Sequence, residues 1–458
     1  MKTQKHIAIF ALVSLAFAGC SNGSGSSPLP GGNSAQSGTF GERGTLSLSS
    51  TAIFGGGATF PAFGYNGAIQ PPSLPAAGSI FASYGGTKIE YCLTGSGYGK
   101  KVFEGVSGAT ALGTCAALGS SPTGFGGGRS SPDLVGSDAA LASADYTSYS
   151  TDEKATRGEP FEAPSIGGPI VFAYKQTDFP GLGTNRLHLS SATYCGITDG
   201  SISDWNNAKV TADNGGKSIT AGASVKITFY YRSDGSGTSF LFQNHLITVC
   251  PSTSTWHTKT TNTAWVGPTG VQPGGNSFVG ESGNPGVEHA IQAQTTKGAV
   301  GYVEGAYAAS AGRPALTQAL LKNRSGVFTD PTSQTAVNAG LANAAVTLGG
   351  SGDNNGTTLP STRKDCILYI SPNTFVNPTA STAYPIVGTS YLLFYGRGNN
   401  TGATAGHLAN LRSLLTYIAG GHVGTISTEY AALPSAIRSR VSAAANGTGV
   451  YAGKACIL

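Results

Sequence analysis

The stretch Tyr231-Arg-Ser-Asp-Gly-Ser-Gly-Thr-Ser-Phe240 joins two segments whose apolar residues are spaced differently. Residues 225–231 form an apolar, β-branched run that predicts a strand, and residues 240–247 carry apolar side chains at helical spacing. The stretch is therefore expected to be a glycine-rich turn between a strand and the N-terminus of a helix. Short strands, glycine turns and helical segments alternate from residue 52 onward, which predicts an α/β fold.

The same turn has the features of an anion site. The first turn of a helix exposes amides without internal partners, and Gly235 and Gly237 let the backbone approach a ligand closely. Arg232, at the end of the strand, adds a cation that can bind two oxygens at once. An ordinary turn, in which Ser236 or Thr238 caps the helix, explains the residues equally well. A second set of groups that converges on the same place would decide between the two.

The composition narrows the class of protein. A chain of 458 residues is long enough for two or three domains of about 100–200 residues each. Only 11% of the residues are charged and 68 are glycine, which favours a loop-rich protein outside the cytoplasm. The formal net charge is +5, and basic residues adjoin only at 100–101 and 363–364, so nucleic acid is not an expected partner.

The N-terminal residues have the pattern of an export signal. Residues 1–20 contain two early lysines, a twelve-residue apolar stretch at 7–18 and then small residues. That stretch is too short to cross about 30 Å of hydrocarbon. Phe17-Ala18-Gly19-Cys20 resembles a bacterial lipobox with Phe17 in place of Leu, which implies lipidation of Cys20, although an ordinary signal peptide cut nearby is the alternative. Residues 21–50 predict a flexible tether.

The remaining six cysteines predict three disulfides, because an even number in an exported chain favours pairing. Six cysteines allow fifteen pairings. Sequence neighbours close the shortest loops, which favours Cys92–Cys115, Cys195–Cys250 and Cys366–Cys456. Neither cysteines nor histidines have the short spacing of a zinc site, so no metal and no other cofactor is expected.

Three further clusters rich in Gly, Ser and Asp could supply the second set of groups. They are residues 54–61, which include Thr59 and Phe60, residues 94–100, which include Ser96, and residues 134–141, which include Asp138. Residues 94–101 do not form a Walker P-loop, because Lys101 stands where Ser or Thr is required. No full G-x-G-x-x-G fingerprint leads into a helix, which excludes a Rossmann site.

Other elements are expected along the chain. The sequence predicts strands at 169–174 and 297–304, a hairpin-type turn at 213–216, a surface loop at 353–356, a helix through Leu408, Leu411, Leu415 and Ile418, and a further helix opened by Pro434.

Taken together, six motifs resemble those of the phosphate-binding proteins of bacterial phosphate ABC transporters, in the family's order. They are Gly57-Ala-Thr-Phe-Pro61, Gly95-Ser-Gly-Tyr-Gly99, Val135-Gly-Ser-Asp-Ala139, Arg232-Ser-Asp-Gly-Ser-Gly-Thr238, Gly298-Ala-Val-Gly-Tyr-Val-Glu304 and Tyr384-Pro-Ile-Val387. The chain is especially similar to the DING-type branch through Cys195-Gly-Ile-Thr-Asp-Gly-Ser-Ile-Ser-Asp-Trp205, Tyr231-Arg232, Cys250 and Cys456. The resemblance covers roughly residues 52 to 458. Departures at 104–131, 190–250 and 326–384 leave the motifs intact.

The resemblance implies a two-lobed periplasmic-binding-protein fold of type II, with a two-segment hinge. After the signal peptide at 1–20 and the tether at 21–50, lobe one is expected at 51–165 and 308–458, and lobe two at 166–307.

The resemblance also implies a phosphate site. Its hydrogen-bond donors are Thr59, Phe60, Ser96, Arg232, Ser236, Gly237 and Thr238. Asp138 can only accept, so it is satisfied by a protonated phosphate oxygen and not by sulfate, which carries no proton at neutral pH; a helix N-cap is the alternative role for Asp138. Asp234 is expected to hold the Arg232 guanidinium flat.

The expected function is capture of inorganic phosphate in the cell envelope or outside the cell, with delivery to an ABC permease. The protein is expected to be a monomer, to meet the membrane only through its lipid, and not to be an enzyme. A secreted phosphomonoesterase of the DING type is the alternative, but only His245 lies near a pocket motif, no carboxylate cluster suits two metals, and Ser236 has no visible base. A surface adhesin with a vestigial site is a third reading.

Overall fold

The computed structural model describes residues 52–67, 75–85, 87–115, 123–126, 129–309, 315–396 and 405–458. The chain divides into the units Met1–Gly44 and Thr45–Leu458, and all that follows concerns the second. The expected leader, Cys20 and the tether at 21–50 lie outside the described residues. Within the described ranges, no helix has both the length and the apolar character needed to cross a membrane.

A mixed sheet of eleven strands forms the centre of this unit, in the order β2-β1-β3-β15-β4-β9-β6-β8-β7, with β10 and β16 also paired to β4. Its strands are β1 Ile53–Gly57, β2 Ile89–Leu93, β3 Leu134–Ser137, β4 Phe161–Tyr174, β6 Thr228–Arg232, β7 Gly270–Val271, β8 Ser277–Glu281, β9 Ala299–Glu304, β10 Thr317–Gln318, β15 Val387–Phe394 and β16 Ala431–Ala432. Two small sheets are formed by β5 His188–Leu189, β11 Leu320–Lys322 and β12 Phe328–Thr329, and by β13 Val346–Leu348 and β14 Leu368–Ile370.

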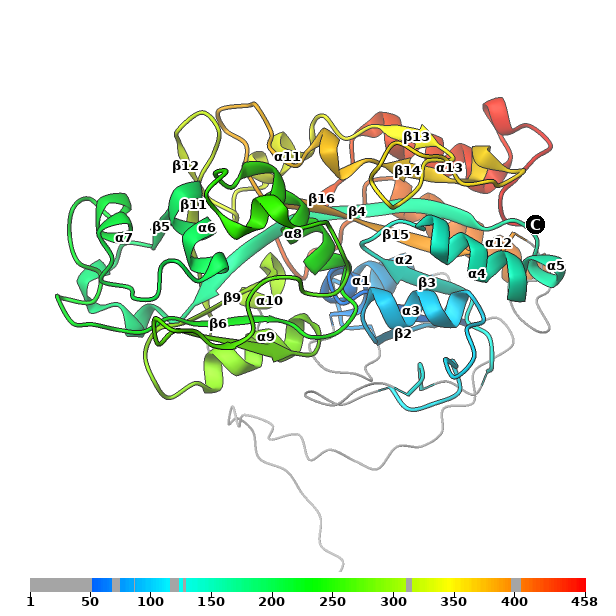
Figure 1. Ribbon diagram of the computed structural model, residues 1–458. Coiled ribbons are helices and arrows are strands. Elements are labelled where there is room, and N and C mark those ends of the chain that lie inside the picture. Colours follow the sequence, from blue (N-terminus) through cyan, green and yellow to red (C-terminus); the bar gives the residue numbers. More distant parts are fainter. Residues whose placement is uncertain are drawn as a thin grey trace, which may run out of the picture. The chain divides into compact units, whose positions relative to one another are not determined.

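The long strand β4 connects two groups of strands (Figure 1). Its first part, from Phe161 to Pro169, pairs with β15, and its last part, from Ile170 to Tyr174, pairs with β9. On the β15 side, β1 runs parallel to β2 and β3, and on the β9 side, β6 runs parallel to β8 and β9. All fourteen residues of β4 are buried, as expected of a strand covered on both faces.

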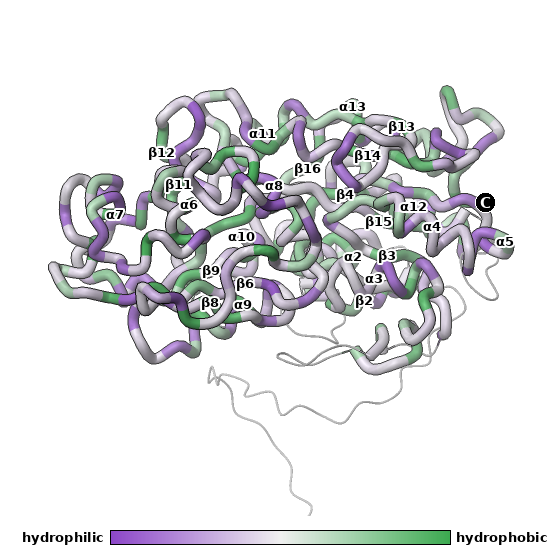
Figure 2. Tube along the Cα trace, in the orientation of Figure 1, coloured by the Kyte–Doolittle hydropathy of each residue, from purple (hydrophilic) through white to green (hydrophobic). Residues whose placement is uncertain are grey.

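Helices pack around these strands. They are α1 Ala62–Asn66, α2 Ile80–Tyr84, α3 Ser96–Phe103, α4 Ser143–Asp152, α5 Lys154–Arg157, α6 Ser191–Asp199, α7 Ala208–Asp213, α8 Gly237–Val249, α9 Gly283–Ala293, α10 Gly305–Ala308, α11 Gln334–Leu341, α12 Ala405–Ala419 and α13 Ser435–Asn446. Apolar stretches follow the central strands and helices, whereas many hydrophilic stretches lie in loops around the edge (Figure 2). The predicted inward faces of α12 and α13 are confirmed, since Leu411, Leu415, Ile418, Ile437 and Val441 are buried.

The three favoured disulfides are confirmed. Cys92 is bonded to Cys115, Cys195 to Cys250 and Cys366 to Cys456, with Cα–Cα distances of 5.8, 5.6 and 5.6 Å. These distances are the usual ones for a disulfide. The first bond joins β2 to the loop after α3, and the third joins the segment before β14 to the C-terminal end of the chain.

Some predicted boundaries and one turn type need correction. The predicted hairpin turn at 213–216 is wrong, because α7 ends at Asp213 and the glycines at 215 and 216, with φ of 72° and 77°, follow as a helix C-terminal turn. A glycine with positive φ ends helices as readily as it turns hairpins, so the residue type alone was ambiguous. The strand predicted at 225–231 is paired from Thr228 to Arg232, and the helix after it begins at Gly237.

Candidate anion-binding site

The glycine turn forms the capped start of a helix, one of the two forms that the sequence allowed. Arg232 is the last residue of β6, and Ser236 is the N-cap of α8, where its hydroxyl accepts the backbone N–H of Ser239 at 3.1 Å. The capping role of Ser236 is therefore confirmed. Gly237 and Thr238, the first two residues of α8, are fully buried, so the helix N-terminus faces the interior.

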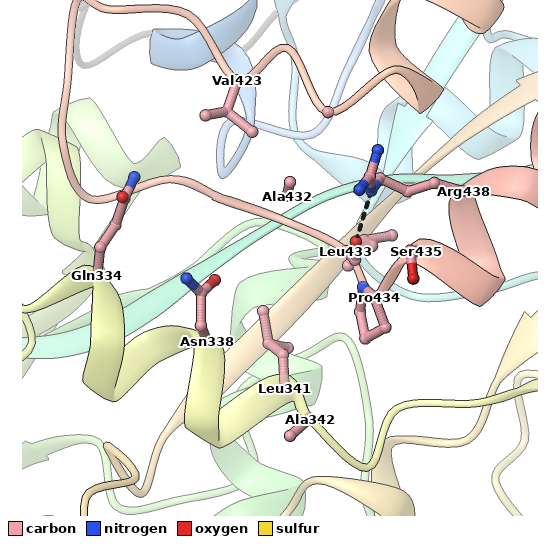
Figure 3. Close-up of a pocket in the computed structure, with 11 residues that line it drawn as sticks. Gln334, Asn338, Leu341, Ala342, Val423, Ala432, Leu433, Pro434, Ser435 and Arg438 are labelled. Carbon is pink, nitrogen blue, oxygen red and sulfur yellow. Dashed lines mark hydrogen bonds between the residues drawn. The ribbon is translucent and has the colours of Figure 1, made fainter.

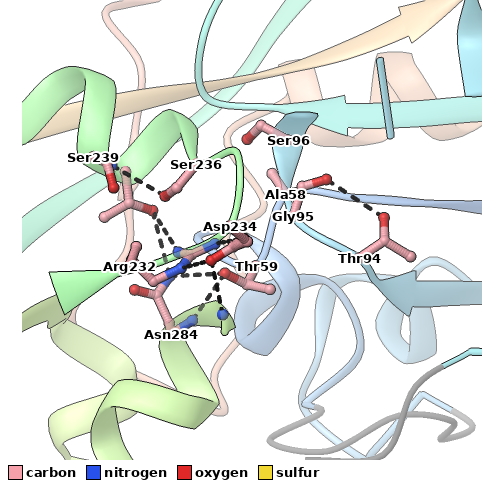
Figure 4. Close-up of polar contacts among 12 residues, drawn as sticks. Ala58, Thr59, Thr94, Gly95, Ser96, Arg232, Asp234, Ser236, Ser239 and Asn284 are labelled. Atoms are coloured by element: carbon pink, nitrogen blue, oxygen red, sulfur yellow. Dashed lines mark hydrogen bonds and ion pairs between the residues drawn. The ribbon is translucent and has the colours of Figure 1, made fainter. Parts of the chain in front are cut away.

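Arg232 lies in the site with its charge paired. Only 1% of the residue is exposed. Its Nε and Nη2 donate to Oδ1 and Oδ2 of Asp234 at 2.6 and 2.5 Å, the two-pronged geometry that keeps a guanidinium flat (Figure 4). Burial by itself lowers the pKa of Arg232, but Asp234 raises it, so the guanidinium stays charged. Oδ1 of Asp234 also accepts the N–H of Gly283 at 3.0 Å.

Asp138 lies on the other side of the site, directly after β3. Its Oδ1 accepts from the hydroxyl of Ser390 at 2.9 Å, and its Oδ2 accepts from Ser96 and Thr238, both at 3.4 Å. Burial raises the pKa of Asp138 to about 7, although the bond from Ser390 pulls it down. The N-cap alternative for Asp138 is wrong, because the N-cap of the next helix, α4, is Ala142.

Thr59 and Phe60 complete the set, in the turn between β1 and α1. The Thr59 hydroxyl accepts from the N–H and the Nδ2 of Asn284 at 3.2 and 3.1 Å. Phe60 is fully buried, and its carbonyl accepts from the Tyr430 hydroxyl at 2.7 Å. Ser96 is the first residue of α3, and its hydroxyl lies close to the carboxylate of Asp138.

Thr238 links the separate parts of this arrangement. Its hydroxyl donates to Asp138 and accepts from Asn284 Nδ2 at 3.4 Å and from Arg232 Nη1 at 3.5 Å. Backbone contacts join the same regions, because the N–H of Gly97 donates to the carbonyl of Gly235 at 2.7 Å. The predicted residues from four distant stretches of chain are thus brought together by the fold.

Two of the glycines are required by this close approach. A Cβ at position 237 would lie 2.6 Å from the Cβ of Asp138, and one at position 95 would lie 2.4 Å from Oδ2 of Asp234. Both distances are shorter than real Cβ contacts, so a side chain at position 237 would force the two sides of the site apart, and one at position 95 would displace the carboxylate of Asp234.

Several residues of the site were missed by the sequence analysis. Asn284 contacts two of the predicted hydroxyls, Ser390 contacts Asp138, and the Tyr302 hydroxyl accepts the N–H of Arg232 at 3.1 Å. Tyr302 lies inside the motif at 298–304 that carried part of the resemblance. Asn284 and Ser390 stand in no motif of that set, and their residue types are common in ordinary turns and strands.

The nearest predicted candidate for a catalytic base is engaged elsewhere. His245 is fully buried on α8, with Nε2 at 2.9 Å from the Tyr194 hydroxyl and Nδ1 at 2.7 Å from the carbonyl of Val376. Burial lowers the pKa of His245 to about 4, which keeps the ring neutral. In the described part of the chain, the one group of three side chains close enough together to bind a metal ion is Asp365, Cys366 and Cys456. The two cysteines of this group form a disulfide with each other.

A surface groove of about 570 Å³ lies away from these residues, between α11, β16 and the start of α13 (Figure 3). Gln334, Asn338 and Leu341 line one wall, and Arg438 donates to the carbonyl of Leu433 on the other. None of the predicted ligand residues lines it.

Comparisons with known proteins identify the family and the fold of this chain. A family model described as a PBP superfamily domain matches residues 45–411. Alkaline phosphatase L of Pseudomonas aeruginosa is 28% identical over 56% of this chain and 57% of its own length. The phosphate-binding protein PstS of Xylella fastidiosa is 31% identical over 50% of this chain and 51% of its own length. The chain thus spans about half the length of these relatives. Phosphate-binding protein PstS 3 of Mycobacterium leprae is 24% identical over 86% of this chain and 92% of its own.

Solved structures share the fold. The crystal structure of a DING protein is 21% identical, covers 86% of this chain and 94% of its own, and has a TM-score of 0.59. The structure of a phosphate-binding protein from Stenotrophomonas maltophilia is 23% identical in sequence, covers 86% of this chain and 93% of its own, and has a TM-score of 0.55. The predicted α/β fold of the two-lobed binding proteins is confirmed, as is the resemblance to phosphate-binding proteins of the DING type. The chain belongs to the PBP superfamily.

Proposed function

We propose that this protein binds inorganic phosphate at the site around Thr238 and delivers it to an ABC permease. One observation carries the proposal: a buried carboxylate, Asp138, and a buried guanidinium, Arg232, are connected through a single hydroxyl of Thr238. A site with a cation and a carboxylate, which in its ionised form can only accept, suits an anion that still carries a proton. Relatives named as phosphate-binding proteins support this choice of anion.

The proposed ligand set divides the work between donors and one acceptor. Arg232, the hydroxyls of Thr59, Ser96, Ser236 and Thr238, and the amides of Thr59, Phe60 and Gly237 donate to phosphate oxygens. Asp138 accepts the proton that phosphate retains. Sulfate has no proton at neutral pH, so it would leave this buried acceptor facing a second anion, at a cost of several kcal/mol.

The proposed lobes are 51–165 with 308–458, and 166–307. The partner exchange of β4 supports two groups of strands, because β4 leaves β15 at Pro169 and joins β9 from Ile170. Within the segment 308–458, β10 and β11 depart from this division, since they pair with the end of β4 and with β5. Thr59, Ser96 and Asp138 then belong to lobe one, and the turn at 232–238 belongs to lobe two. Contacts such as Gly97 to Gly235 would break when the lobes open, so binding would favour the closed form.

The remaining parts of the proposal concern the cellular setting. We infer a periplasmic or secreted protein that carries a signal peptide at 1–20, is lipidated at Cys20, and is held near the membrane by the tether at 21–50. It is proposed to act as a monomer and without catalytic activity. Mass spectrometry of the mature N-terminus tests the anchor, since an unmodified serine or glycine at the start would contradict it.

Calorimetric titration of the purified protein with phosphate tests the proposed function. We expect saturable binding with a dissociation constant at or below the micromolar range, and much weaker binding of sulfate at the same pH. Absence of any phosphate binding at micromolar concentrations would overturn the proposal.

A phosphomonoesterase that uses the same pocket is the second candidate, favoured by the similarity to alkaline phosphatase L. Hydrolysis needs an activated nucleophile. Among the described residues, the Ser236 hydroxyl contacts the backbone N–H of Ser239 and not a base, and His245 is held by the Tyr194 hydroxyl and the Val376 carbonyl, so this arrangement does not activate Ser236. Release of chromophore from a chromogenic phosphate ester, lost in Arg232→Ala, would favour the enzyme over the carrier.

A further inference from the structure

Asn284 is a fully buried asparagine that lies against the site without belonging to the ligand set proposed above. It is the second residue of α9, and 0% of it is exposed. Its backbone N–H and its Nδ2 both donate to the Thr59 hydroxyl, at 3.2 and 3.1 Å, and Nδ2 also donates to the Thr238 hydroxyl at 3.4 Å (Figure 4). One side chain therefore contacts two of the proposed phosphate donors.

The orientation of the Asn284 amide is fixed by its other end. Oδ1 accepts the backbone N–H of Glu304 at 3.3 Å, at the end of β9. An amide oxygen is an acceptor and its nitrogen carries two hydrogens. Because the oxygen faces a donor, the two hydrogens of Nδ2 must face the hydroxyls of Thr59 and Thr238. Both hydrogens are then used, so Asn284 has none left for a ligand.

The Thr59 hydroxyl is left with one direction in which to donate. A hydroxyl has one hydrogen and two acceptor positions. The N–H and Nδ2 of Asn284 occupy both acceptor positions. The hydrogen of Thr59 must therefore point away from Asn284, toward an acceptor in the site.

The Thr238 hydroxyl is constrained in the same way. It accepts from Asn284 Nδ2 and from Arg232 Nη1, and its own hydrogen is directed to Oδ2 of Asp138. The bond from Asn284 thus helps to fix the donors on both proposed lobes, since Thr59 belongs to lobe one and Thr238 to lobe two.

We propose that Asn284 is a positioning residue for the phosphate site: before the anion arrives, it turns the hydroxyl of Thr59 outward as a donor and holds the hydroxyl of Thr238 with its hydrogen on the Asp138 side. This inference rests on the proposed function. Preorganised donors bind an anion without the cost of reorienting, so affinity falls when the organising group is removed.

Two substitutions separate positioning from simple support. Asn284→Ala removes the side-chain bonds, and we expect the dissociation constant for phosphate to rise about tenfold, as for one or two lost hydrogen bonds. Asn284→Asp keeps the shape but places an acceptor where the two hydrogens were. The Thr59 hydroxyl would then donate to the new carboxylate and not to the anion, and the added negative charge would repel the anion, so we expect a loss of about 100-fold or more.

A double-mutant cycle with Thr59→Val tests the route through which Asn284 acts. Thr59→Val lacks the hydroxyl to be oriented, so Asn284→Ala should weaken phosphate binding clearly less in that background than in the wild type. Asn323→Ala is the matched control, since Asn323 is another buried asparagine with bonds to the carbonyls of Ser381 and Ala383, and it should lower the melting temperature without changing phosphate affinity.

The outcomes distinguish the two proposals. If the wild-type protein binds no phosphate, the proposed function fails and this inference fails with it. If the wild type binds and the Asn284 variants bind equally tightly, or if the effects of Asn284→Ala and Thr59→Val multiply as independent changes, the positioning role is overturned while the function stands. If Asn284→Asp does not fold, the cycle with Asn284→Ala decides alone.

Discussion

The two charged groups of the site are buried alike but held differently. Arg232 and Asp138 are 1% and 2% exposed. Arg232 is paired through two short bonds with the carboxylate of Asp234 and stays charged, whereas Asp138 is held by the hydroxyls of Ser96, Thr238 and Ser390. One side therefore offers a permanent charge, and the other an acceptor whose pKa is raised to about 7. The comparison suggests that Arg232 mainly gives affinity and Asp138 mainly gives selectivity.

The largest effect is expected from Arg232→Ala. This change removes the cation and leaves Asp234 without its partner beside the anion, so phosphate affinity should fall about 1000-fold or more, as when one member of a buried charge pair is lost. Calorimetric titration measures the loss.

Arg363→Ala is the matched control for Arg232→Ala. Arg363 forms the same two-pronged pair with Asp365, two residues further on, but the side chains are 27% and 36% exposed. The control should bind phosphate like the wild type. Equal losses of phosphate affinity in both variants would mean that Arg232 makes no specific contribution to phosphate binding.

A smaller effect, but on a different quantity, is expected from Asp138→Asn. The amide can donate to an unprotonated oxygen, so sulfate should bind more tightly and phosphate less tightly. We expect the ratio of the two affinities to shift by about 100-fold or more, the scale of an unpaired buried polar group. Competition of sulfate against bound phosphate provides the measurement. Unchanged affinities for both anions would refute the selectivity role.

The raised pKa of Asp138 predicts how stability depends on pH in the protein without phosphate. The pKa is about 7 in the folded protein and about 4 in the unfolded chain, so the folded state holds more protons between these values. The free energy of unfolding should therefore fall as pH rises through this range, by about 2 kcal/mol from Asp138 between pH 5 and pH 7.

Urea unfolding at pH 5 and pH 7 checks this slope, with Asp138→Asn as the reference. In the variant, Glu162, whose pKa is raised to about 8 by burial, still contributes to the pH dependence of the free energy of unfolding, but Asp138 no longer does. The difference between the two proteins isolates one carboxyl. Identical slopes in both would show that Asp138 is ionised throughout.

The sequence allowed the motif residues to be predicted because each lies at the end of a strand, where a glycine-rich turn is visible. It also allowed the disulfides to be predicted, because pairing each cysteine with its neighbour in the sequence closes the shortest loops. It did not reveal Asn284 or Ser390, because each acts through a contact made only after distant strands pair. Asn284 comes 225 residues after Thr59, and Ser390 comes 252 residues after Asp138. Positioning depends on three-dimensional register, which residue type and spacing do not encode.

The smallest effect is expected from Ser390→Ala, which changes the Asp138 side without touching the charge. Ser390 donates to Oδ1 at 2.9 Å and lowers the pKa of Asp138, so its loss should raise that pKa further. One hydrogen bond to a carboxylate is worth about 1.5 kcal/mol, and phosphate affinity should change by about tenfold or less. The slope of stability against pH should extend to higher pH than in the wild type.

Ser165→Ala is the control for Ser390→Ala, since its buried hydroxyl donates to the carbonyl of Ser390 at 2.9 Å and does not contact Asp138. Both variants lose one buried hydroxyl in the same region, so both should lower the melting temperature. Only Ser390→Ala should move the pH at which stability levels off, because only that serine donates to the carboxylate. A shift of the same size in Ser165→Ala would mean that packing of β15, and not the hydroxyl of Ser390, sets the protonation of Asp138.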